Sequence, residues 1–141
     1  MKDSCIFCKI IAGELPSNKV YEDKAILAFL DANPASEGHT LIIPKEHCEN
    51  IYDIEEETLS KIAVLSKKLA NIYKERLNID NINILNSNGK YAQQDVPHYH
   101  MHLIPRKKDD KKLFKWGKQE VNHKKLLEKI VLELADKKYP V

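Results

Sequence analysis

Residues 98–104 read His-Tyr-His-Met-His-Leu-Ile, so histidine occupies every second position, at His98, His100 and His102. Because successive side chains of an extended strand point to opposite faces, the three imidazoles are predicted to share one face of a strand. The strand rise separates neighbouring rings by roughly 7 Å and the outer rings by about 13 Å, too far for one metal ion to bind all three. The sequence therefore predicts that the rings have different tasks and that the middle ring is exposed.

The composition of the chain fits one compact domain spanning residues 1–141, with 43% hydrophobic residues. The formal net charge of +2 comes from nearly balanced acids and bases, which argues against a nucleic-acid coat or a membrane-surface protein. Three cysteines, an odd number, favour a reducing compartment over a disulfide framework. No signal peptide or membrane-spanning run is evident, so we expect a soluble cytoplasmic protein.

The remaining hydrophobic pattern predicts antiparallel strands and two helices. Strands are expected at residues 20–21, 25–31, 39–43 and 82–85, followed by the histidine strand, which ends at Pro105. Helical spacing of apolar residues predicts a long helix that ends near Leu77, with Asp53 and Glu56 as a capping box. A second helix is expected around residues 126–134, with Asn122 as its cap. The pattern is α+β, an antiparallel meander with one long helix inserted before the final pair of strands.

The segment Arg106 to Lys125 contains nine basic and three acidic residues, with Phe114 and Trp116 among them. This composition is typical of a solvated, flexible surface. The alternative is a surface that binds phosphates or RNA, but the balanced charge of the whole chain argues against a nucleic-acid partner.

Cys5 and Cys8 are separated by two residues, the spacing that lets two thiolates bind one tetrahedral zinc ion. The other two ligands would come from a wider set, comprising His39, His47, Cys48, His123 and one histidine of residues 98–104. We favour His47 and His98, because each lies next to a strand end or a turn. A pair of buried thiols and a redox motif are the alternatives, although a redox motif lacks its expected βαβ setting.

If His98 binds a metal ion, His100 and His102 are free to act on a substrate. Two imidazoles held close together lower each other's affinity for a second proton, which keeps a nitrogen neutral and nucleophilic. Hydrogen-bonding and cationic groups around such a strand attract anions, so a phosphate ester is the expected substrate class. Acyl transfer fits less well, because no serine or cysteine lies near these histidines.

Together these motifs resemble the histidine triad family, and within it the Hint-like branch of nucleoside phosphoramidases. The resemblance covers nearly the whole chain. Besides residues 98–104, it rests on Cys5 to Glu14, Ala28 to Asp31 and His39 to His47.

The resemblance implies a five-stranded antiparallel sheet with two helices, and a homodimer whose sheet is continuous across a two-fold axis. It also implies that His100 attacks the α-phosphorus of a purine nucleoside phosphoramidate of the AMP type. A covalent nucleotidyl-histidine would form, an amine would leave, and water would release the nucleotide. By the same resemblance, Cys5, Cys8, His47 and His98 would bind a structural zinc ion.

The resemblance also assigns roles to the residues around the nucleophile. His102 and His39 would orient it and bind phosphate oxygens, and Asp31 would accept hydrogen bonds from the ribose hydroxyls. Phe7, Ile10, Phe29 and Leu41 would enclose the base. Asn86 would meet the phosphate side. Gln94 and Asp95 complete the predicted nucleotide-binding set.

Three residues depart from the family pattern. Gln93 replaces the glycine that lets the backbone approach the phosphate, and Pro97 removes a backbone donor at the start of the predicted strand. Asp95 replaces serine, threonine or glutamate, where it would repel an anionic substrate or protonate the leaving group. These departures keep open the hypothesis of a nucleotide-binding regulatory protein with weak catalysis. A second alternative is a dinucleoside polyphosphate hydrolase of the sister branch, although the short loop from Gly89 to Gln94 and the cysteine pair match the Hint-like branch better.

Overall fold

The computed structural model describes residues 2–110, 120 and 122–135, with side chains described up to residue 131. The chain divides into two compact units, residues 1–110 and residues 111–141. Half of the basic segment, including Phe114 and Trp116, lies outside the described residues. The expectation of a single domain over residues 1–141 stays a prediction.

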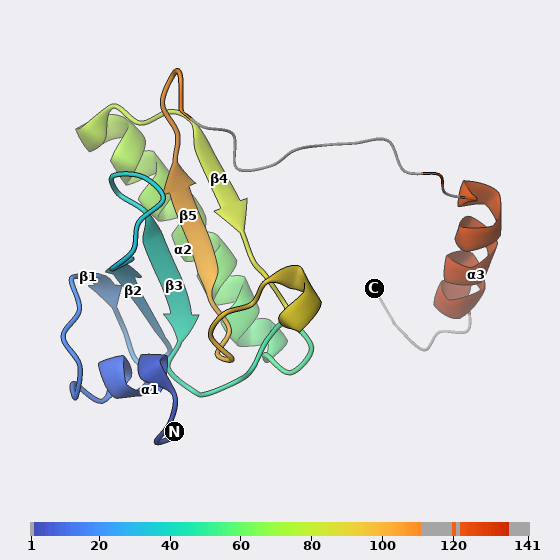
Figure 1. Cartoon of the computed structure of the whole chain (residues 1–141), viewed down its shortest axis with the longest axis horizontal. Helices are drawn as coiled ribbons and strands as arrows, with labels where there is room; N and C mark the ends of the chain where they lie inside the picture. Colours follow the sequence, from blue (N-terminus) through green and yellow to red (C-terminus); the bar gives the residue numbers. More distant parts are fainter. Residues whose placement is uncertain (1, 111–119, 121, 136–141) are drawn as a thin grey trace. The chain divides into compact units, whose positions relative to one another are not determined.

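The first unit is built on a five-stranded antiparallel sheet in the order β1-β2-β3-β5-β4 (Figure 1). The strands are β1 (Lys19–Glu22), β2 (Ile26–Leu30), β3 (Thr40–Pro44), β4 (Ile82–Leu85) and β5 (Met101–Pro105). A strict meander would place β4 beside β3. Instead, the long helix between them leads the chain to the edge of the sheet, and β5 returns into the gap. The predicted α+β fold is confirmed.

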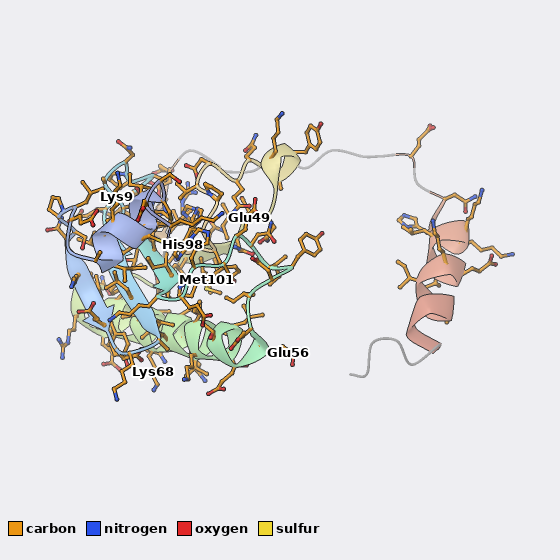
Figure 2. All side chains as sticks on the ribbon, turned by 90° about the horizontal axis from the view of Figure 1, so that it is seen from below. Lys9, Glu49, Glu56, Lys68, His98 and Met101 are labelled. Atoms are coloured by element: carbon orange, nitrogen blue, oxygen red, sulfur yellow. The ribbon has the colours of Figure 1, made fainter. Side chains whose placement is uncertain are left out.

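Helices cover both faces of this sheet. Helix α1 (Ile6–Ile11) and helix α2 (Glu56–Leu77) lie on opposite sides (Figure 2). On the α1 side, Leu27 and Phe29 of β2 pack in one apolar cluster, whereas Ile26 and Ala28 pack in the cluster on the α2 side. Because β2 and β3 are buried on both faces, their sequences are continuous apolar runs.

Helix α2 ends as expected, but it begins differently. Asn78 adopts a left-handed conformation with φ 56° and ends the helix after Leu77. The predicted capping box is wrong: the residue before the helix is Glu55, and no side chain caps it. The Asp53 carboxylate instead accepts hydrogen bonds from the backbone N–H groups of Glu49 and Asn50, at 2.9 and 2.8 Å. A nearby loop therefore uses the carboxylate that the pattern assigned to the helix.

The histidine stretch is a strand only from Met101 onward, so its first three residues lie before β5. The His98 N–H donates to the Val96 carbonyl at 2.8 Å, a three-residue turn that suits the restricted φ of Pro97. Pro97 therefore removes no donor from the sheet. The alternation of faces persists, since Tyr99, Met101 and Leu103 pack in the α2-side core.

In the second unit, helix α3 (His123–Ala135) follows its predicted cap: the Lys125 N–H donates to Asn122 Oδ1 at 3.1 Å. Within the described part of the chain, no helix has both the length and the apolar character needed to cross a membrane.

Candidate functional site

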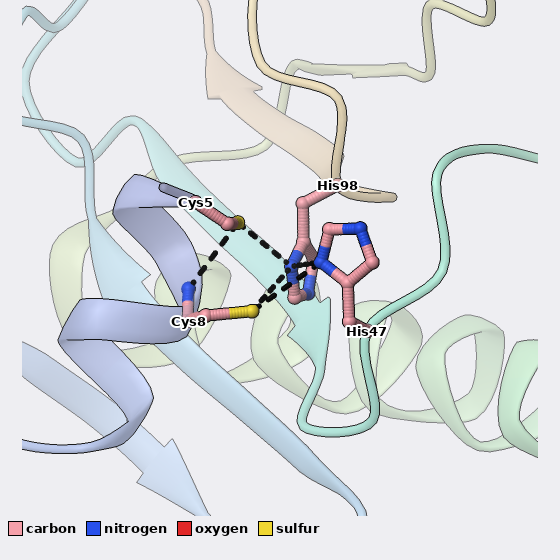
Figure 3. Close-up of side chains that lie close together, drawn as sticks. All are labelled: Cys5, Cys8, His47 and His98. Carbon is pink, nitrogen blue, oxygen red and sulfur yellow. Dashed lines mark hydrogen bonds between the residues drawn. The ribbon is translucent and has the colours of Figure 1, made fainter. Parts of the chain in front are cut away.

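Four side chains from three separate segments converge at one end of α1 (Figure 3). Cys5 Sγ lies 3.3 Å from His98 Nδ1, and Cys8 Sγ lies 3.3 Å from His47 Nδ1. The two Nδ1 atoms are 3.1 Å apart. Cys5 precedes α1 and Cys8 lies within it, so one helical turn brings both sulfur atoms to the same side. We call these four residues the Cys/His cluster.

The distances in the Cys/His cluster fit a tetrahedral metal site. Typical Zn–S and Zn–N bonds would separate a sulfur from a nitrogen by about 3.5 Å and two nitrogens by about 3.3 Å. A second observation concerns the proton of His98: its Nε2 lies 2.8 Å from the Pro44 carbonyl oxygen, which can only accept. The Nε2–H therefore donates to Pro44, and the lone pair of Nδ1 faces the thiols, as in many zinc-binding histidines.

Burial favours the neutral forms of His47, His98 and Cys8 in this cluster. Burial lowers the pKa of His98 to about 4 and also lowers the pKa of His47. Burial raises the pKa of the Cys8 thiol. Neutral imidazoles suit metal binding directly, whereas the thiols must lose their protons to a cation. Cys48 and His39 were also candidate zinc ligands from the sequence. Cys48 instead packs in the α2-side core, and His39 lies in a different cluster of side chains.

The middle histidine, His100, has a defined orientation. Its Nδ1 lies 2.7 Å from the carbonyl oxygen of His98, so Nδ1 carries the proton and donates it. In the neutral ring, Nε2 then keeps its lone pair, which is the state a nucleophile requires. The Phe7 ring packs edge-on against His100, with centroids 5.2 Å apart. The Asn86 side chain donates to the backbone carbonyl of His100 at 2.9 Å, which fixes the main chain at this point.

His39 and His102 form a hydrogen-bonded pair beside His100. The backbone N–H of Ala35 donates to His39 Nδ1 at 2.9 Å, so the proton of a neutral His39 is on Nε2. That Nε2 lies 2.9 Å from His102 Nδ1, which must accept. His102 therefore presents Nε2–H as a donor. Asp31 Oδ2 lies 3.5 Å from His39 Nε2 and adds a negative charge to the pair.

Burial opposes a positive charge on either ring of this pair. Burial, followed by the positive charges that His100 and His39 would carry, lowers the pKa of His102 to about 4. Burial also lowers the pKa of His39, although the Asp31 carboxylate partly opposes this effect. With both rings neutral, the pair has one N–H that is not used inside it, the Nε2–H of His102.

His100 and His102 line a cavity of about 180 Å³ on the α1 side of the sheet. The expectation of an exposed middle ring is wrong as a statement about surface area, because only 2% of His100 is exposed. Access is through the cavity. Its other lining residues, from strands β2 and β3, helix α1 and the loops, include Phe7, Ile10, Phe29, Asp31, Leu41 and Asp95.

The structure thus brings together the predicted nucleotide-binding residues except Asn86 and Gln94. The Asn86 amide donates to His100, as described, rather than facing the cavity. The Gln94 amide accepts from the Gly89 N–H at 2.8 Å and donates to the carbonyls of Glu49 and Val96. Both side chains therefore support the loop around the site. Sequence reasoning did not find Ile6 and Val96, which also line the cavity, although each is next to a predicted site residue.

Helix α1 was not predicted either, because six residues are too few for a helical period to be read. The one available signal was Cys5 itself, whose sulfur accepts from the Cys8 N–H at 3.4 Å as an N-cap.

Comparison with known proteins gives the following findings. The sequence model of the HIT domain family matches residues 12–109. A protein of Saccharomyces cerevisiae named adenosine 5'-monophosphoramidase is 45% identical over 136 residues, which cover 90% of this chain and 83% of that protein. The crystal structure of a HIT family member from Bacillus subtilis superposes with a TM-score of 0.85, at 39% identity over 99% of this chain and 100% of that one. A zinc-bound histidine triad family protein from Mycobacterium smegmatis has a TM-score of 0.74, at 35% identity over 96% of this chain and 98% of that one.

Proposed function

This chain belongs to the HIT domain family, and on that premise we propose that it is a nucleotide hydrolase that cleaves the P–N bond of adenosine 5'-phosphoramidates and related purine nucleoside phosphoramidates. The observation that carries the proposal is the orientation of His100. Its Nδ1–H is engaged by the His98 carbonyl at 2.7 Å, so the lone pair of Nε2 is available at the wall of the cavity.

The reaction proceeds in two displacements. The lone pair of His100 Nε2 attacks the α-phosphorus, a P–Nε2 bond forms, and the P–N bond to the amine breaks as the leaving nitrogen takes a proton from water. A second water then attacks the phosphorus, the P–Nε2 bond breaks, its electron pair returns to Nε2, and a proton is released. The Nε2–H of His102 donates to a phosphoryl oxygen in both steps, where negative charge accumulates.

The apolar part of the cavity suits a purine base. Phe7 and Phe29 contact each other edge-on, with ring centroids 5.7 Å apart, and Ile10 and Leu41 extend this surface. An aromatic and aliphatic enclosure of this kind binds a flat base through its faces. The Asp31 carboxylate, at the same cavity, accepts hydrogen bonds from the ribose hydroxyls.

The direct test is hydrolysis of adenosine 5'-phosphoramidate by the purified protein, with ³¹P NMR of the protein after rapid denaturation in base to trap the P–Nε2 adduct. We expect AMP and ammonia as products, and an adduct that is absent in His100→Ala. Tight AMP binding with neither turnover nor adduct would overturn the proposal in favour of a nucleotide-binding protein. Faster cleavage of diadenosine polyphosphates than of the phosphoramidate would overturn it in favour of a polyphosphate hydrolase.

We further propose that the Cys/His cluster binds one structural zinc ion. The distances among the four ligand atoms, the Nε2–H to Pro44 hydrogen bond of His98, and the zinc-bound relative support this assignment. When bound, zinc would neutralise the thiolates and tie α1 to the segment before β5. The free state of the three cysteines is also consistent with action in a reducing cytoplasm.

A homodimer is also proposed. Strand β4 is at the edge of the sheet, and Ile84 on this strand is 53% exposed. Several apolar side chains of α2, Val64, Ile72 and Leu77, are exposed as well. A strand with an unpaired edge and exposed apolar side chains are both features that a second copy can cover. Sedimentation should give twice the chain mass of 16.3 kDa, and Ile84→Lys should shift the protein toward monomer. A monomeric wild-type protein would contradict the proposal.

A further inference from the structure

The cavity that contains His100 has an unusual charge for a phosphate site. Among the described residues that line it, the charged side chains are Asp31 and Asp95, and none is lysine or arginine. The hydrogen-bond donors that its side chains offer to phosphate are therefore the Nε2–H of His102 and the amide of Asn33, neither of which carries a formal positive charge. A site of this kind can accept the single negative charge of a phosphoramidate. Each additional negative charge on a substrate is repelled by two carboxylates, and no lysine or arginine among the described lining residues compensates for it.

Asp95 lies next to the atom at which the reaction takes place. Its Oδ1 is 3.5 Å from His100 Nε2, and its side chain is 80% exposed. The side chain of Asp31 is less exposed. It accepts a hydrogen bond from the Asn33 N–H and lies beside His39. Asp95 is thus the carboxylate at the solvent side of the reacting group, where the variable part of a substrate extends.

We propose that Asp95 is a specificity-determining residue that favours leaving amines with an additional positive charge and disfavours anionic leaving groups. The inference rests on the proposed hydrolysis of phosphoramidates and names the class of amine that leaves. The bonds made and broken are those given above, and Asp95 takes part in none of them. It acts through the field of its charge on the tail of the leaving group.

The size of the effect follows from distance and solvent. A charge on the tail, about 6–8 Å from the carboxylate in a largely aqueous environment, would change the rate about threefold to tenfold relative to a neutral tail. The change has opposite signs for a cation and an anion. Since Asp95 is exposed, salt would screen the effect at ionic strengths where the Debye length falls below about 6 Å.

The experiment compares three adenosine 5'-phosphoramidates with tails of similar length, made from ethylenediamine, propylamine and β-alanine. These tails end in an ammonium, a methyl and a carboxylate group. Because the amines differ in intrinsic reactivity, the measured quantity is the ratio of kcat/KM between two substrates, compared between wild type and variant. In Asp95→Asn and Asp95→Ser, we expect the ammonium-to-methyl ratio to fall about threefold to tenfold and the methyl-to-carboxylate ratio to fall similarly.

Glu57→Gln is the matched control. Glu57 is an exposed acid on α2, on the opposite side of the sheet, and pairs with Lys61. Its neutralisation should leave both ratios as in wild type. Raising the salt concentration from 0.05 to 0.5 M should reduce the wild-type ratios and leave those of Asp95→Asn nearly constant.

Two failures can be distinguished. If wild-type protein with zinc does not hydrolyse the propylamine compound at all, the proposed function itself is wrong. If it hydrolyses that compound but both ratios are the same in wild type and in the Asp95 variants, only the role of Asp95 is overturned. A fall in both ratios in Glu57→Gln as large as in Asp95→Asn would also overturn it, because the effect would then follow net charge rather than position.

Discussion

Two histidines from the same short stretch of sequence, His98 and His100, lie in environments with opposite consequences. In the Cys/His cluster, the Nε2–H of His98 donates to the Pro44 carbonyl, and Nδ1 points at two thiols and His47. Two residues further on, the Nδ1–H of His100 donates to the His98 carbonyl, and Nε2 faces a cavity. The rings are chemically identical, but opposite nitrogens carry their protons.

This difference shows that a backbone carbonyl determines the task of each imidazole. A carbonyl can only accept, so the nitrogen beside it must be protonated and the other nitrogen of the neutral ring keeps its lone pair. In one case the lone pair faces two thiols and a second imidazole, and in the other it faces a cavity. The predictions below separate these two tasks experimentally.

The largest effect is expected when the lone pair in the cavity is removed. His100→Ala should reduce phosphoramidate turnover about 10³-fold or more, because no other group replaces the nucleophile. Zinc content and the circular dichroism spectrum should remain those of wild type. Loss of zinc in this variant would show that the two groups of histidines are not independent.

The next largest effect concerns the Cys/His cluster. Cys8→Ser should lose bound zinc and lower the melting temperature by about 10 °C, because the remaining three ligands would be a weaker site and α1 would lose its attachment. Metal analysis and thermal unfolding measure both quantities. The matched control is Cys48→Ser, which removes a thiol that packs in the α2-side core instead. Equal zinc content in Cys8→Ser and wild type would remove the proposed metal site.

A smaller effect is expected in the histidine pair beside the nucleophile. His39→Phe keeps a ring of similar size but removes the donor to His102 Nδ1 at 2.9 Å. The Nε2–H of His102 is then no longer selected, so kcat should fall about 10- to 100-fold while KM changes little. Steady-state kinetics test this expectation. A rise in KM at constant kcat would assign His39 to substrate binding alone.

Stability of the metal-free protein should depend on pH through His102, and also through His98, whose pKa burial likewise lowers to about 4. Burial and the neighbouring histidines lower its folded pKa to about 4, below the ordinary value of about 6.5 in the unfolded chain. Between these values the unfolded state binds more protons, so the free energy of unfolding should decrease as pH falls from about 6.5 to about 4. Urea unfolding across this range measures the slope, and His102→Asn should reduce it. An unchanged slope would mean that His102 is not the titrating group.

The smallest effect lies in the loop that leads to both groups of histidines. Gln93 has φ 65°, a left-handed conformation that strains a residue with a side chain. Gln93→Gly should therefore raise the free energy of unfolding by about 0.5 kcal/mol, because relief of this strain exceeds the entropy that glycine adds to the unfolded chain. Chemical denaturation measures the change. A decrease would show that the Gln93 side chain stabilises the loop.

Several features of the molecule could be predicted from the sequence because they depend on residues that are close together in the chain. The alternation of residues 98–104 predicts two faces, and Tyr99, Met101 and Leu103 do pack together opposite the histidines. The spacing of Cys5 and Cys8 predicts sulfur atoms that point to one side. Asn122 is a cap as expected, because its side chain needs only a helix that begins directly after it.

Features that depend on competition between partners could not be predicted in the same way. The Asp53 carboxylate could have capped the start of α2 or bonded to a nearby loop. It accepts hydrogen bonds from the backbone N–H groups of Glu49 and Asn50 in the loop. Gln94 and Asn86 were assigned to a nucleotide from their positions, but their amides bond to backbone groups. Such choices depend on which donor or acceptor lies within about 3 Å after folding.

The amino-acid order alone determined the α+β fold, the two faces of the histidine stretch and the common side of the two cysteine sulfur atoms, because side-chain period and ligand spacing are local properties. Only the tertiary structure decided which nitrogen of each ring is protonated, since the Pro44 carbonyl, the His98 carbonyl and the Ala35 N–H reach the rings through the fold. Only the tertiary structure, likewise, placed the Asp95 carboxylate beside Nε2 of His100.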